Sequence, residues 1–479
     1  MTFGLAVLLA VVAFYLPGWV ALKPLRLGQA QAFIFAPCAS LFFYVILVFA
    51  CSMAGMFMTG ALLLGGGLCI ALIVCATGFA LRRVTGKDSK AASDCKPSVK
   101  RIKAFLYDQR HLFLYIGMGV VLTAFVFVRN LDGPDSFAQL SDNIYHLSLI
   151  RSYVESGNWS PLAATIFPED AWTVSASFYP SLFHIMAAMI VGILDAPIAL
   201  AQNALIAAIL AVVFPASILQ FVKTVLPDRP DIWFYGAFVM LGFAAFPWMF
   251  LVFGPLHSNL LSFSLVPLGL SAFMLLLGKG APRAERIKWG TLFAMGLVSM
   301  AVAQTNACFT VGVILMPYCL VRIWGASKHA ATPVRRYGPV VLSVAAVIVL
   351  WCVCFNLPPL RGVVNHTWPA FSFLSQTPIN MLYLAFKDSA AQIFLGAVLL
   401  VGIIRLCHVK QSRWLIWSYG IFCFLYVVCA LTDGPVKQFL AGFWYTDGYR
   451  LAASAVICAI PIAAAGLYRL ARFVQHLLG

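Results

Sequence analysis

Long apolar segments alternate with short polar ones along the whole chain. The apolar runs are 17 to 25 residues long and recur from one end of the sequence to the other. A helix of about 20 apolar residues spans the hydrocarbon core of a bilayer, and a helix satisfies its own backbone polar groups in lipid. The pattern therefore predicts an all-α polytopic membrane protein with about 13 transmembrane helices, within a range of roughly 11 to 14.

The charged segments between these runs indicate the orientation of the chain. The segment 82–111 carries nine Lys and Arg residues against three Asp residues. Because cytoplasmic loops carry such a basic excess, we expect this segment on the cytoplasmic side of the cell membrane. Three predicted spans precede it, near residues 3–22, 32–54 and 58–81. The N-terminus is then outside, the C-terminus is cytoplasmic, and the external loops are residues 130–177, 356–390 and 432–447.

We expect three parts along the chain: an N-terminal three-span unit at 1–81, a basic cytoplasmic linker at 82–111, and a transmembrane core at 112–479. The shortest apolar stretch, 178–194, contains Tyr179 and Pro180 at its start. We interpret it as a juxtamembrane or re-entrant helix along the outer face, because the charged loops require an odd number of crossings. This interpretation places residues 226–231 inside and residues 253–259 outside.

Composition supports the assignment to membrane proteins and limits the kinds of partner that we expect. Apolar residues make up 62% of the chain and charged residues 10%, with a net charge of +16. The basic residues are scattered over short loops, so we expect membrane lipids as partners and no nucleic acid. None of the 13 cysteines lies in the three external loops, which argues against a disulfide framework. The first span has no basic preceding region and no small-residue cleavage site, so we expect it to remain as a membrane helix.

The first external loop concentrates charge. It holds six of the sixteen acidic residues, with Arg151 as its single basic residue. Its stretch SDNIYHLSLIRSYVESGNW, residues 141–159, predicts a helix over 142–155, because Gly and Pro are absent until Gly157. The helix is amphipathic. At about 100° per residue, one face carries Asp142, Tyr145, His146, Leu149 and Tyr153, and Arg151 lies on the opposite face.

This face suggests acid–base chemistry. A carboxylate and an imidazole one helical turn apart can hydrogen-bond, which orients the carboxylate and tunes its pKa. A carboxylate can also take the proton of an acceptor hydroxyl, so Asp142 and His146 are the candidate catalytic residues. The structural alternative is that Asp142 or Ser141 caps the helix and that His146 is a polar surface residue.

Two later external loops combine basic with aromatic residues: NLPPLRGVVNHTW at 356–368 and KQFLAGFWYTDGYR at 437–450. Their cations, at Arg361, Lys437 and Arg450, could bind a lipid-linked phosphate. Alternatively they contact lipid headgroups as interfacial residues, and Asp447 forms a local ion pair with Arg450 at i, i+3. The other candidate substrate-binding residues are Asp447, Tyr145, Tyr179, His184 and His257.

Two features that the sequence lacks reduce the range of possible functions. The central parts of the predicted spans hold almost no ionisable residues, which disfavours an ion-coupled transporter. The cytoplasmic loops contain no phosphate loop and no dinucleotide fingerprint. An enzyme whose polar residues lie outside the cell has no access to cytosolic nucleotide sugars. The activated donor that we expect is therefore one that the membrane delivers, such as a polyprenyl-phosphate-linked sugar.

The stretches SDNIYHLSLIRSYVESGNWSP, FYPSLFHIMAAMI, AFPWMFLVFGPLHSN and FWYTDGYRLAA resemble a largely uncharacterised, mainly actinobacterial membrane-protein family that is regarded as similar to the glycosyltransferase-C (GT-C) superfamily. The resemblance covers residues 130–470. It implies a GT-C-like fold in which Asp142 is the catalytic base, His146 belongs to the same motif, and Arg450 contacts the phosphate of a polyprenyl-phospho-sugar. Many GT-C members carry adjacent acidic residues, whereas position 143 is Asn, so a divalent metal held by two carboxylates is not supported.

These observations together predict a membrane glycosyltransferase of cell-envelope polysaccharide biosynthesis. It would move a sugar from a polyprenyl-phosphate carrier to an envelope glycan or lipid acceptor on the outer face. The main alternative is a non-catalytic transporter, flippase or scaffold for lipid-linked glycans, which would tolerate Asp142→Asn. A polymerase or ligase acting on the same carriers is a third alternative, since it would use the same kinds of external residues.

Overall fold

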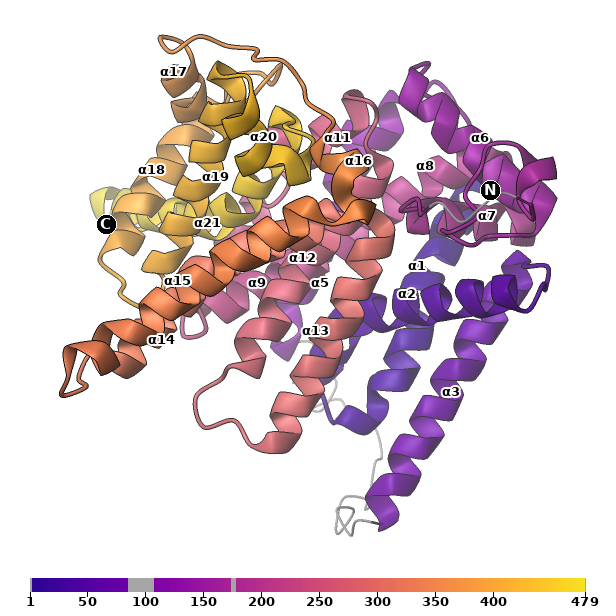
Figure 1. Cartoon of the computed structure of the whole chain (residues 1–479), viewed down its shortest axis with the longest axis horizontal. Coiled ribbons are helices and arrows are strands. Elements are labelled where there is room, and N and C mark those ends of the chain that lie inside the picture. The colour runs from indigo at the N-terminus through magenta and orange to yellow at the C-terminus, as the bar shows by residue number, and fades with distance from the viewer. Residues whose placement is uncertain (1, 85–106, 174–177, 479) are drawn as a thin grey trace. The chain divides into compact units, whose positions relative to one another are not determined.

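The computed structural model describes residues 2–84, 107–173 and 178–478 (Figure 1). Over these residues the regular structure consists of helices, and the described ranges contain no strand. The predicted all-α class is therefore confirmed. Most of the predicted linker 82–111 falls on residues 85–106, which lie outside the described ranges.

Among the described residues, eleven helices are long and apolar enough to cross a membrane. They are α1 (Thr2–Leu22), α2 (Gln29–Met53), α3 (Gly60–Val84), α5 (Arg110–Leu122) with its extension to Asn130, α8 (Ile198–Ala208) continuing into α9 (Phe214–Val225), α12 (His257–Leu276), α13 (Arg283–Gln304), α14 (Asn306–Ser327), α15 (Pro333–Asn356), α19 (Arg413–Leu431) and α21 (Gly448–Leu478).

One further crossing is a bent pair of helices. The helix α10 (Pro230–Val239) and the segment Ala244–Val252, which ends in α11 (Met249–Val252), meet at an angle of 51°. If this pair is counted as one span, the number of candidate membrane spans in the described residues rises to 12. The predicted number of about 13 would also require α18 (Ile393–Cys407), which has only 15 residues, to cross.

The helices form two compact units. Unit 1 contains Met1–Thr224 and Leu251–Thr305, and unit 2 contains Val225–Phe250 and Asn306–Gly479. In unit 1 the first helices pack against later ones, α1 against α8 and α2 against α13. Contact clustering thus groups the first three spans with later helices of unit 1, whereas the sequence predicted a separate N-terminal unit at 1–81.

The short helix α7 (Leu182–Leu194) differs from the sequence interpretation. We expected it to lie along the outer face, but residues 182–190 are all buried inside unit 1. The helix packs against α3, α8 and α6 (Ser141–Ser156). Its 13 residues, at about 1.5 Å each, are too short to span a bilayer. Because its side chains are apolar on every side except at His184, burial in a core suits it better than an interface with one polar face.

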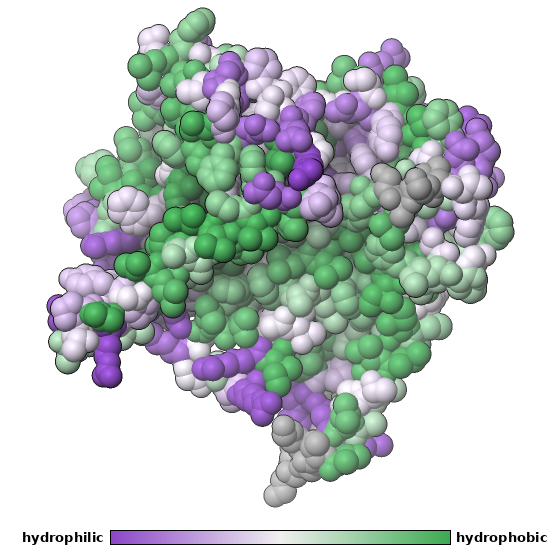
Figure 2. Space-filling model, in the orientation of Figure 1, coloured by the Kyte–Doolittle hydropathy of each residue, from purple (hydrophilic) through white to green (hydrophobic). Residues whose placement is uncertain are grey.

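Helix α15 in unit 2 has the opposite character, since none of its residues is buried. Its exposed side chains include Val341, Leu342 and Leu350. Figure 2 shows that the hydrophobic colour dominates the face on which α15 lies. In water such a continuous apolar surface would be costly, whereas lipid tails solvate it, so this helix supports the assignment to a membrane.

Two glycines bring α18 and α21 of unit 2 into close contact. A Cβ atom built on Gly466 would lie 1.9 Å from the carbonyl oxygen of Val398. A Cβ on Gly402 would lie 2.0 Å from the carbonyl oxygen of Ile462. Small residues at such positions let the backbones of two membrane helices approach each other, and this interface has no room for a methyl group.

We predict that Gly466→Ala lowers the apparent melting temperature of the purified protein in detergent. The added methyl group forces the two backbones apart, which costs about 1–3 kcal/mol. The control is Gly420→Ala in α19, where a Cβ would meet no atom within 4 Å. Alanine favours a helix over glycine, so the control variant should melt at the wild-type temperature or above it. Equal melting temperatures for both variants would contradict the tight interface.

Candidate functional site

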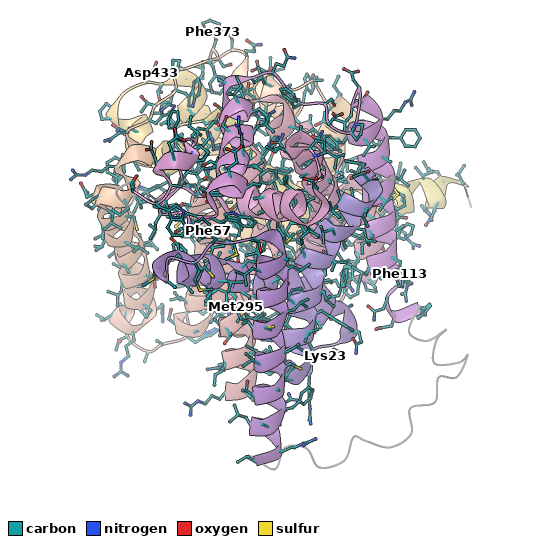
Figure 3. All side chains as sticks on the ribbon, turned by 90° about the vertical axis from the view of Figure 1, so that its right-hand side faces the viewer. Lys23, Phe57, Phe113, Met295, Phe373 and Asp433 are labelled. Carbon is teal, nitrogen blue, oxygen red and sulfur yellow. The ribbon has the colours of Figure 1, made fainter. Side chains whose placement is uncertain are left out.

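The helix predicted over residues 142–155 is present as α6 (Ser141–Ser156). It ends at Gly157, whose φ of +68° is the left-handed conformation that glycine tolerates best. The loop between α2 and α3 packs against this end: the Met58 amide donates to the Gly157 carbonyl over 2.7 Å. Phe57 of the same loop (Figure 3) packs its ring against that of Trp172, with 5.3 Å between centroids.

The two faces of α6 have the predicted character. His146, Leu149 and Tyr153 are buried. On the other side Arg151 and Glu155 form an exposed ion pair with an N–O distance of 2.6 Å. Asp142 lies exposed in the first turn, where the helix dipole favours a negative charge. The residue before the helix is Leu140 and no side chain caps this end, so the capping alternative for Asp142 and Ser141 is wrong.

Two polar residues of the spanning helix α8 hold the chain around the start of α6. The Gln202 side chain donates to the Asn143 side chain over 3.0 Å. The Asn203 side chain donates to the carbonyl oxygens of Pro134 and Ser136, at 3.1 and 2.7 Å. Buried amide groups need such partners. Gln202 and Asn203 were not among the predicted site residues, although a Gln-Asn pair inside an apolar run is a visible signal.

His146 connects three segments of unit 1. Its Nδ1 lies 2.7 Å from Nε2 of His184, and its Nε2 lies 3.1 Å from the carbonyl oxygen of Pro255. A carbonyl only accepts, so Nε2 of His146 carries a proton and donates it to Pro255. In the neutral pair, Nδ1 of His146 then accepts the proton on Nε2 of His184. Both ring nitrogens of His146 are therefore engaged, and the predicted hydrogen bond to Asp142 is not formed.

The other predicted residues of this region gather around His146. The ring of His257 lies 5.3 Å from that of His146. The ring of Tyr179 lies 5.8 Å from that of His184 and 5.1 Å from that of Tyr145. Unit 1 thus brings together six predicted site residues, which we name the imidazole cluster: Asp142, Tyr145, His146, Tyr179, His184 and His257.

Asp142 belongs to this cluster through the loop that carries Pro255. Gly254 has a φ of +104°, and a Cβ built on it would lie 3.0 Å from Oδ2 of Asp142. The carboxylate therefore lies directly against this glycine. Because the next residue, Pro255, accepts the hydrogen bond of His146, the buried imidazole fixes the loop beside the exposed carboxylate.

Burial keeps the imidazoles neutral. The pKa of His184 is held well below 6.5 by desolvation and then by the nearby rings of His146 and His257. Desolvation also lowers the pKa of His146, against smaller opposing effects from the Pro255 carbonyl and the Asp142 charge. The described residues contain no group of three or more His, Cys, Asp or Glu side chains arranged to hold a metal ion. The neutral, hydrogen-bonded imidazoles are suited to positioning neighbouring groups.

Unit 2 contains a second set of predicted residues around Arg450. Nη1 of Arg450 lies 2.7 Å from Oδ2 of Asp447, and the Asp447 side chain is fully buried. The predicted i, i+3 ion pair is thus confirmed. Asp447 also accepts from the backbone amide of Tyr449 over 3.0 Å. The guanidinium lies 4.6 Å from the ring centre of Tyr445, and its buried Nε has no hydrogen-bond partner among the described residues.

The loop before Arg450 has an unusual backbone. Tyr445 and Thr446 have φ values of +61° and +51°, which side-chain-bearing residues rarely adopt. The buried Oγ1 of Thr446 accepts a hydrogen bond from the amide of Trp368 over 2.7 Å. This bond connects the loops 432–447 and 356–390, both of which were predicted to be external. Such conformations persist where the surroundings enforce them, and they are common at binding sites.

The remaining predicted cations of unit 2 differ in their surroundings. Lys437 is buried, and its Nζ lies 3.3 Å from Oδ1 of Asp433. Arg361 is exposed at the start of the short helix α16 (Arg361–Val364). Lys387 was not among the predicted site residues. Its Nζ lies 4.7 Å from the ring centre of Phe371 and 4.6 Å from that of Tyr449.

Lys387 is a partly buried cation in an aromatic setting. Desolvation lowers its pKa, while Asp447 and Asp388 oppose this effect. Asp388 also accepts a hydrogen bond from the hydroxyl of Tyr449, which joins Lys387's loop to α21. A signal was present in the sequence, because Lys387 is the one lysine of the predicted external loop 356–390, and basic residues are rare in external loops.

A family model described as "Family of unknown function (DUF6541)" matches residues 11–479. The match covers nearly the whole chain, so the protein belongs to this family. No curated protein matches the chain. No solved structure matches it either. The family description names no activity, and the function is therefore inferred from the two sets of residues described above.

We predict that acid destabilises the protein through the imidazole pair. The pKa values of His146 and His184 are lowered on folding, so below about pH 6.5 the unfolded chain binds protons that the folded chain excludes. Stability is then highest above this pH and falls as the pH decreases below it. The apparent melting temperature, followed from about pH 8 to about pH 5, should fall more steeply for the wild type than for His146→Gln/His184→Gln.

The control for this experiment replaces two exposed histidines, in His329→Gln/His408→Gln. This double variant should keep the wild-type dependence on pH. If both double variants lose the acid sensitivity to the same extent, the imidazole pair is not its cause.

We also predict that the buried ion pair of unit 2 is essential for stability. Asp447→Asn leaves the Arg450 guanidinium buried without its counter-charge, which costs about 3–5 kcal/mol. Glu155→Gln removes the acid of the exposed pair on α6, and such pairs contribute about 0–1 kcal/mol. Thermal unfolding in detergent should show a large loss for Asp447→Asn and almost none for Glu155→Gln. A small loss for both would mean that Arg450 finds another partner.

Proposed function

We propose that this member of the family of unknown function is a GT-C-like membrane glycosyltransferase of the cell envelope. In this proposal it moves a sugar from a polyprenyl-phosphate carrier to an envelope glycan or lipid acceptor on the outer face of the membrane. One observation carries the proposal: the Asp142 carboxylate is exposed, yet it stands on a helix and beside a loop that buried imidazoles hold in place.

The role of Asp142 follows from the demands of glycosyl transfer. The acceptor hydroxyl must lose its proton as its oxygen attacks the anomeric carbon, and a positioned carboxylate can take that proton. An exposed carboxylate is accessible to an acceptor from solvent or from the lipid interface. Positioning matters as much as basicity, because small errors in geometry are costly to the rate.

His146 is a positioning residue in this proposal. Its buried ring donates to Pro255 and accepts from His184, so it holds the loop against which Asp142 packs. It does not act as the base, because Nε2 is protonated and bonded to a carbonyl, and Nδ1 is occupied by His184. Tyr145 and Tyr179 extend the cluster with aromatic surface, on which sugar rings commonly stack through their C–H faces.

In this proposal the leaving phosphate needs positive charge, and unit 2 contains cations suited to bind it. In a single inverting displacement the acceptor oxygen bonds to the anomeric carbon, the bond from that carbon to the phosphate oxygen breaks, and the phosphate leaves with the electron pair. We assign Arg450 to this phosphate, because Asp447 fixes its orientation through one nitrogen while Nε keeps an unused donor. Lys437, Lys387 and Arg361 add charge in the same external loops.

The test compares cells that lack the protein with cells that carry the wild type or Asp142→Asn. Mass spectrometry follows polyprenyl-phospho-sugars, and linkage analysis follows the envelope glycans. The proposal predicts that both the deletion and Asp142→Asn lose one glycosidic linkage and accumulate one carrier-linked sugar. Because a general base contributes about 10²–10⁴-fold, residual transfer in the variant should be at most about 1%.

Glu155→Gln is the matched control, since it removes an exposed carboxylate from the same helix. It should restore the linkage as the wild type does, with equal amounts of folded protein for each variant. If Asp142→Asn also restores the linkage that the deletion lacks, the protein moves or scaffolds lipid-linked glycans without catalysing transfer.

A further inference from the structure

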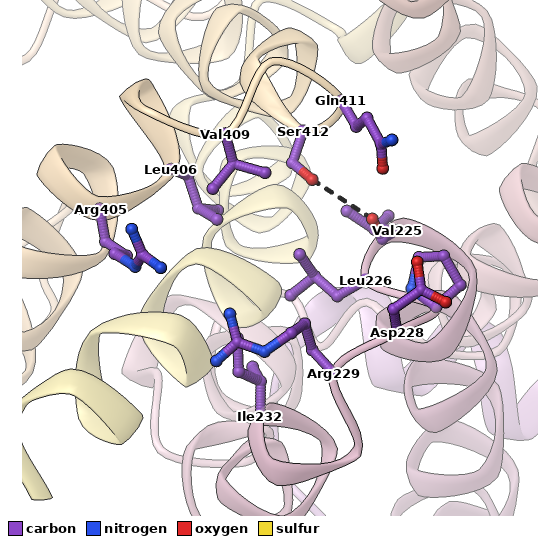
Figure 4. Close-up of a pocket in the computed structure, with 11 residues that line it drawn as sticks. Val225, Leu226, Asp228, Arg229, Ile232, Arg405, Leu406, Val409, Gln411 and Ser412 are labelled. Carbon is purple, nitrogen blue, oxygen red and sulfur yellow. Dashed lines mark hydrogen bonds between the residues drawn. The ribbon is translucent and has the colours of Figure 1, made fainter. Parts of the chain in front are cut away.

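Unit 2 contains a pocket that is lined by none of the residues of the predicted external loops. It has a volume of about 170 Å³ and lies between the turn 225–232 and the segment 405–412 (Figure 4). This volume is equivalent to roughly five or six water molecules at liquid density, which is enough for a small anionic group. Apolar side chains, including Leu226, Ile232 and Val409, form part of its wall.

Two arginines contribute the charge of this pocket. Arg229 is held in place, because its Nε and Nη2 donate to the two carboxylate oxygens of Asp231, at 3.2 and 2.9 Å. Its guanidinium also lies 5.0 Å from the ring centre of Tyr468. Arg405 is exposed, and its guanidinium has no hydrogen bond or ion pair within the described ranges. One cation is thus fixed in orientation and the other has all its donors available.

The one acid of the pocket wall does not neutralise Arg405. Asp228 lines the pocket, but Figure 4 shows its carboxylate on the side opposite Arg405. Lys410 and Arg413 add further positive charge to the segment that carries Arg405. A guanidinium presents several donors in a planar fork that matches the oxygens of a phosphate group.

The surroundings indicate where a phosphate would come from. The first segment includes residues 226–231, which the sequence predicts to lie inside. The second carries Arg405 and Lys410 and no acidic residue, which is typical of a cytoplasmic loop. Anionic lipids are concentrated in the cytoplasmic leaflet, and basic pockets between membrane helices on that side bind their headgroups. The mixture of apolar walls and arginines suits a group that is charged at one end and lipidic at the other.

We propose that this pocket is a phosphate-binding site, with Arg405 and Arg229 as the residues that hold the anion. The phosphate is that of an anionic lipid headgroup or a free phosphate ion, since the recognition chemistry is the same. The site is separate from the proposed transferase chemistry, and its occupancy can be measured without any assay of glycosyl transfer.

The experiment uses the full-length protein in nanodiscs of phosphatidylcholine with increasing phosphatidylglycerol, and native mass spectrometry after gentle release. A second arm adds inorganic phosphate to the protein in pure phosphatidylcholine and follows thermal unfolding. The variants are Arg405→Gln, Arg405→Lys, and Lys410→Gln. The last is the matched control, because it removes the same charge from the same exposed segment but not from the pocket wall.

We expect the wild type and Lys410→Gln to retain phosphatidylglycerol over phosphatidylcholine, and Arg405→Gln to bind it about tenfold more weakly, with Arg405→Lys between them. Stabilisation by inorganic phosphate that depends on Arg405, without any preference for phosphatidylglycerol, would support the site and identify a soluble source. Equal binding of both lipids together with no Arg405-dependent effect of phosphate would overturn the proposal. An equal loss in Arg405→Gln and Lys410→Gln would also overturn it, since general surface charge would then explain the binding.

Discussion

The hydrogen bond between His146 and His184 is the interaction on which the rest of the candidate site in unit 1 depends. It joins α6 to the buried helix α7, and the second nitrogen of His146 joins both helices to the loop at Pro255. A buried imidazole without partners would be costly, so each ring enforces the position of the other. The exposed carboxylate of Asp142 is therefore positioned by a polar contact that is buried from water.

The same constraint shapes the surroundings of this bond. Gln202 and Asn203 place amide groups inside an apolar helix, where each needs a partner, and they find it in the segment that leads into α6. The chain between two spans is thereby attached to the interior at several points. Buried polar groups in this protein act chiefly as anchors, and the groups available for chemistry are those that the anchors leave exposed.

Unit 2 also contains a buried polar group that needs a partner, and there an ion pair takes the place of the imidazole pair. Asp447 compensates the buried guanidinium of Arg450, and the ring of Tyr445 covers it. The left-handed backbone at Tyr445 and Thr446 is held by the bond from Trp368. The loops 356–390 and 432–447 are therefore connected beside one buried cation. An arginine so constrained loses little conformational entropy when it binds an anion, which favours binding over a flexible surface arginine.

Periodicity and composition were sufficient to predict the individual helices, because whether a segment forms a helix depends mainly on its own residues. The long apolar runs, the helix over 142–155 with its stop at Gly157, and the pairing of Asp447 with Arg450 all follow from local spacing. Partners that come from distant segments do not follow from spacing. The sequence suggested Asp142 as the partner of His146, whereas tertiary packing supplied His184 and Pro255. The burial of α7, the aromatic setting of Lys387 and the meeting of Arg229 with Arg405 in one pocket were likewise decided by packing, since side chains far apart in sequence become neighbours only when the helices pack together.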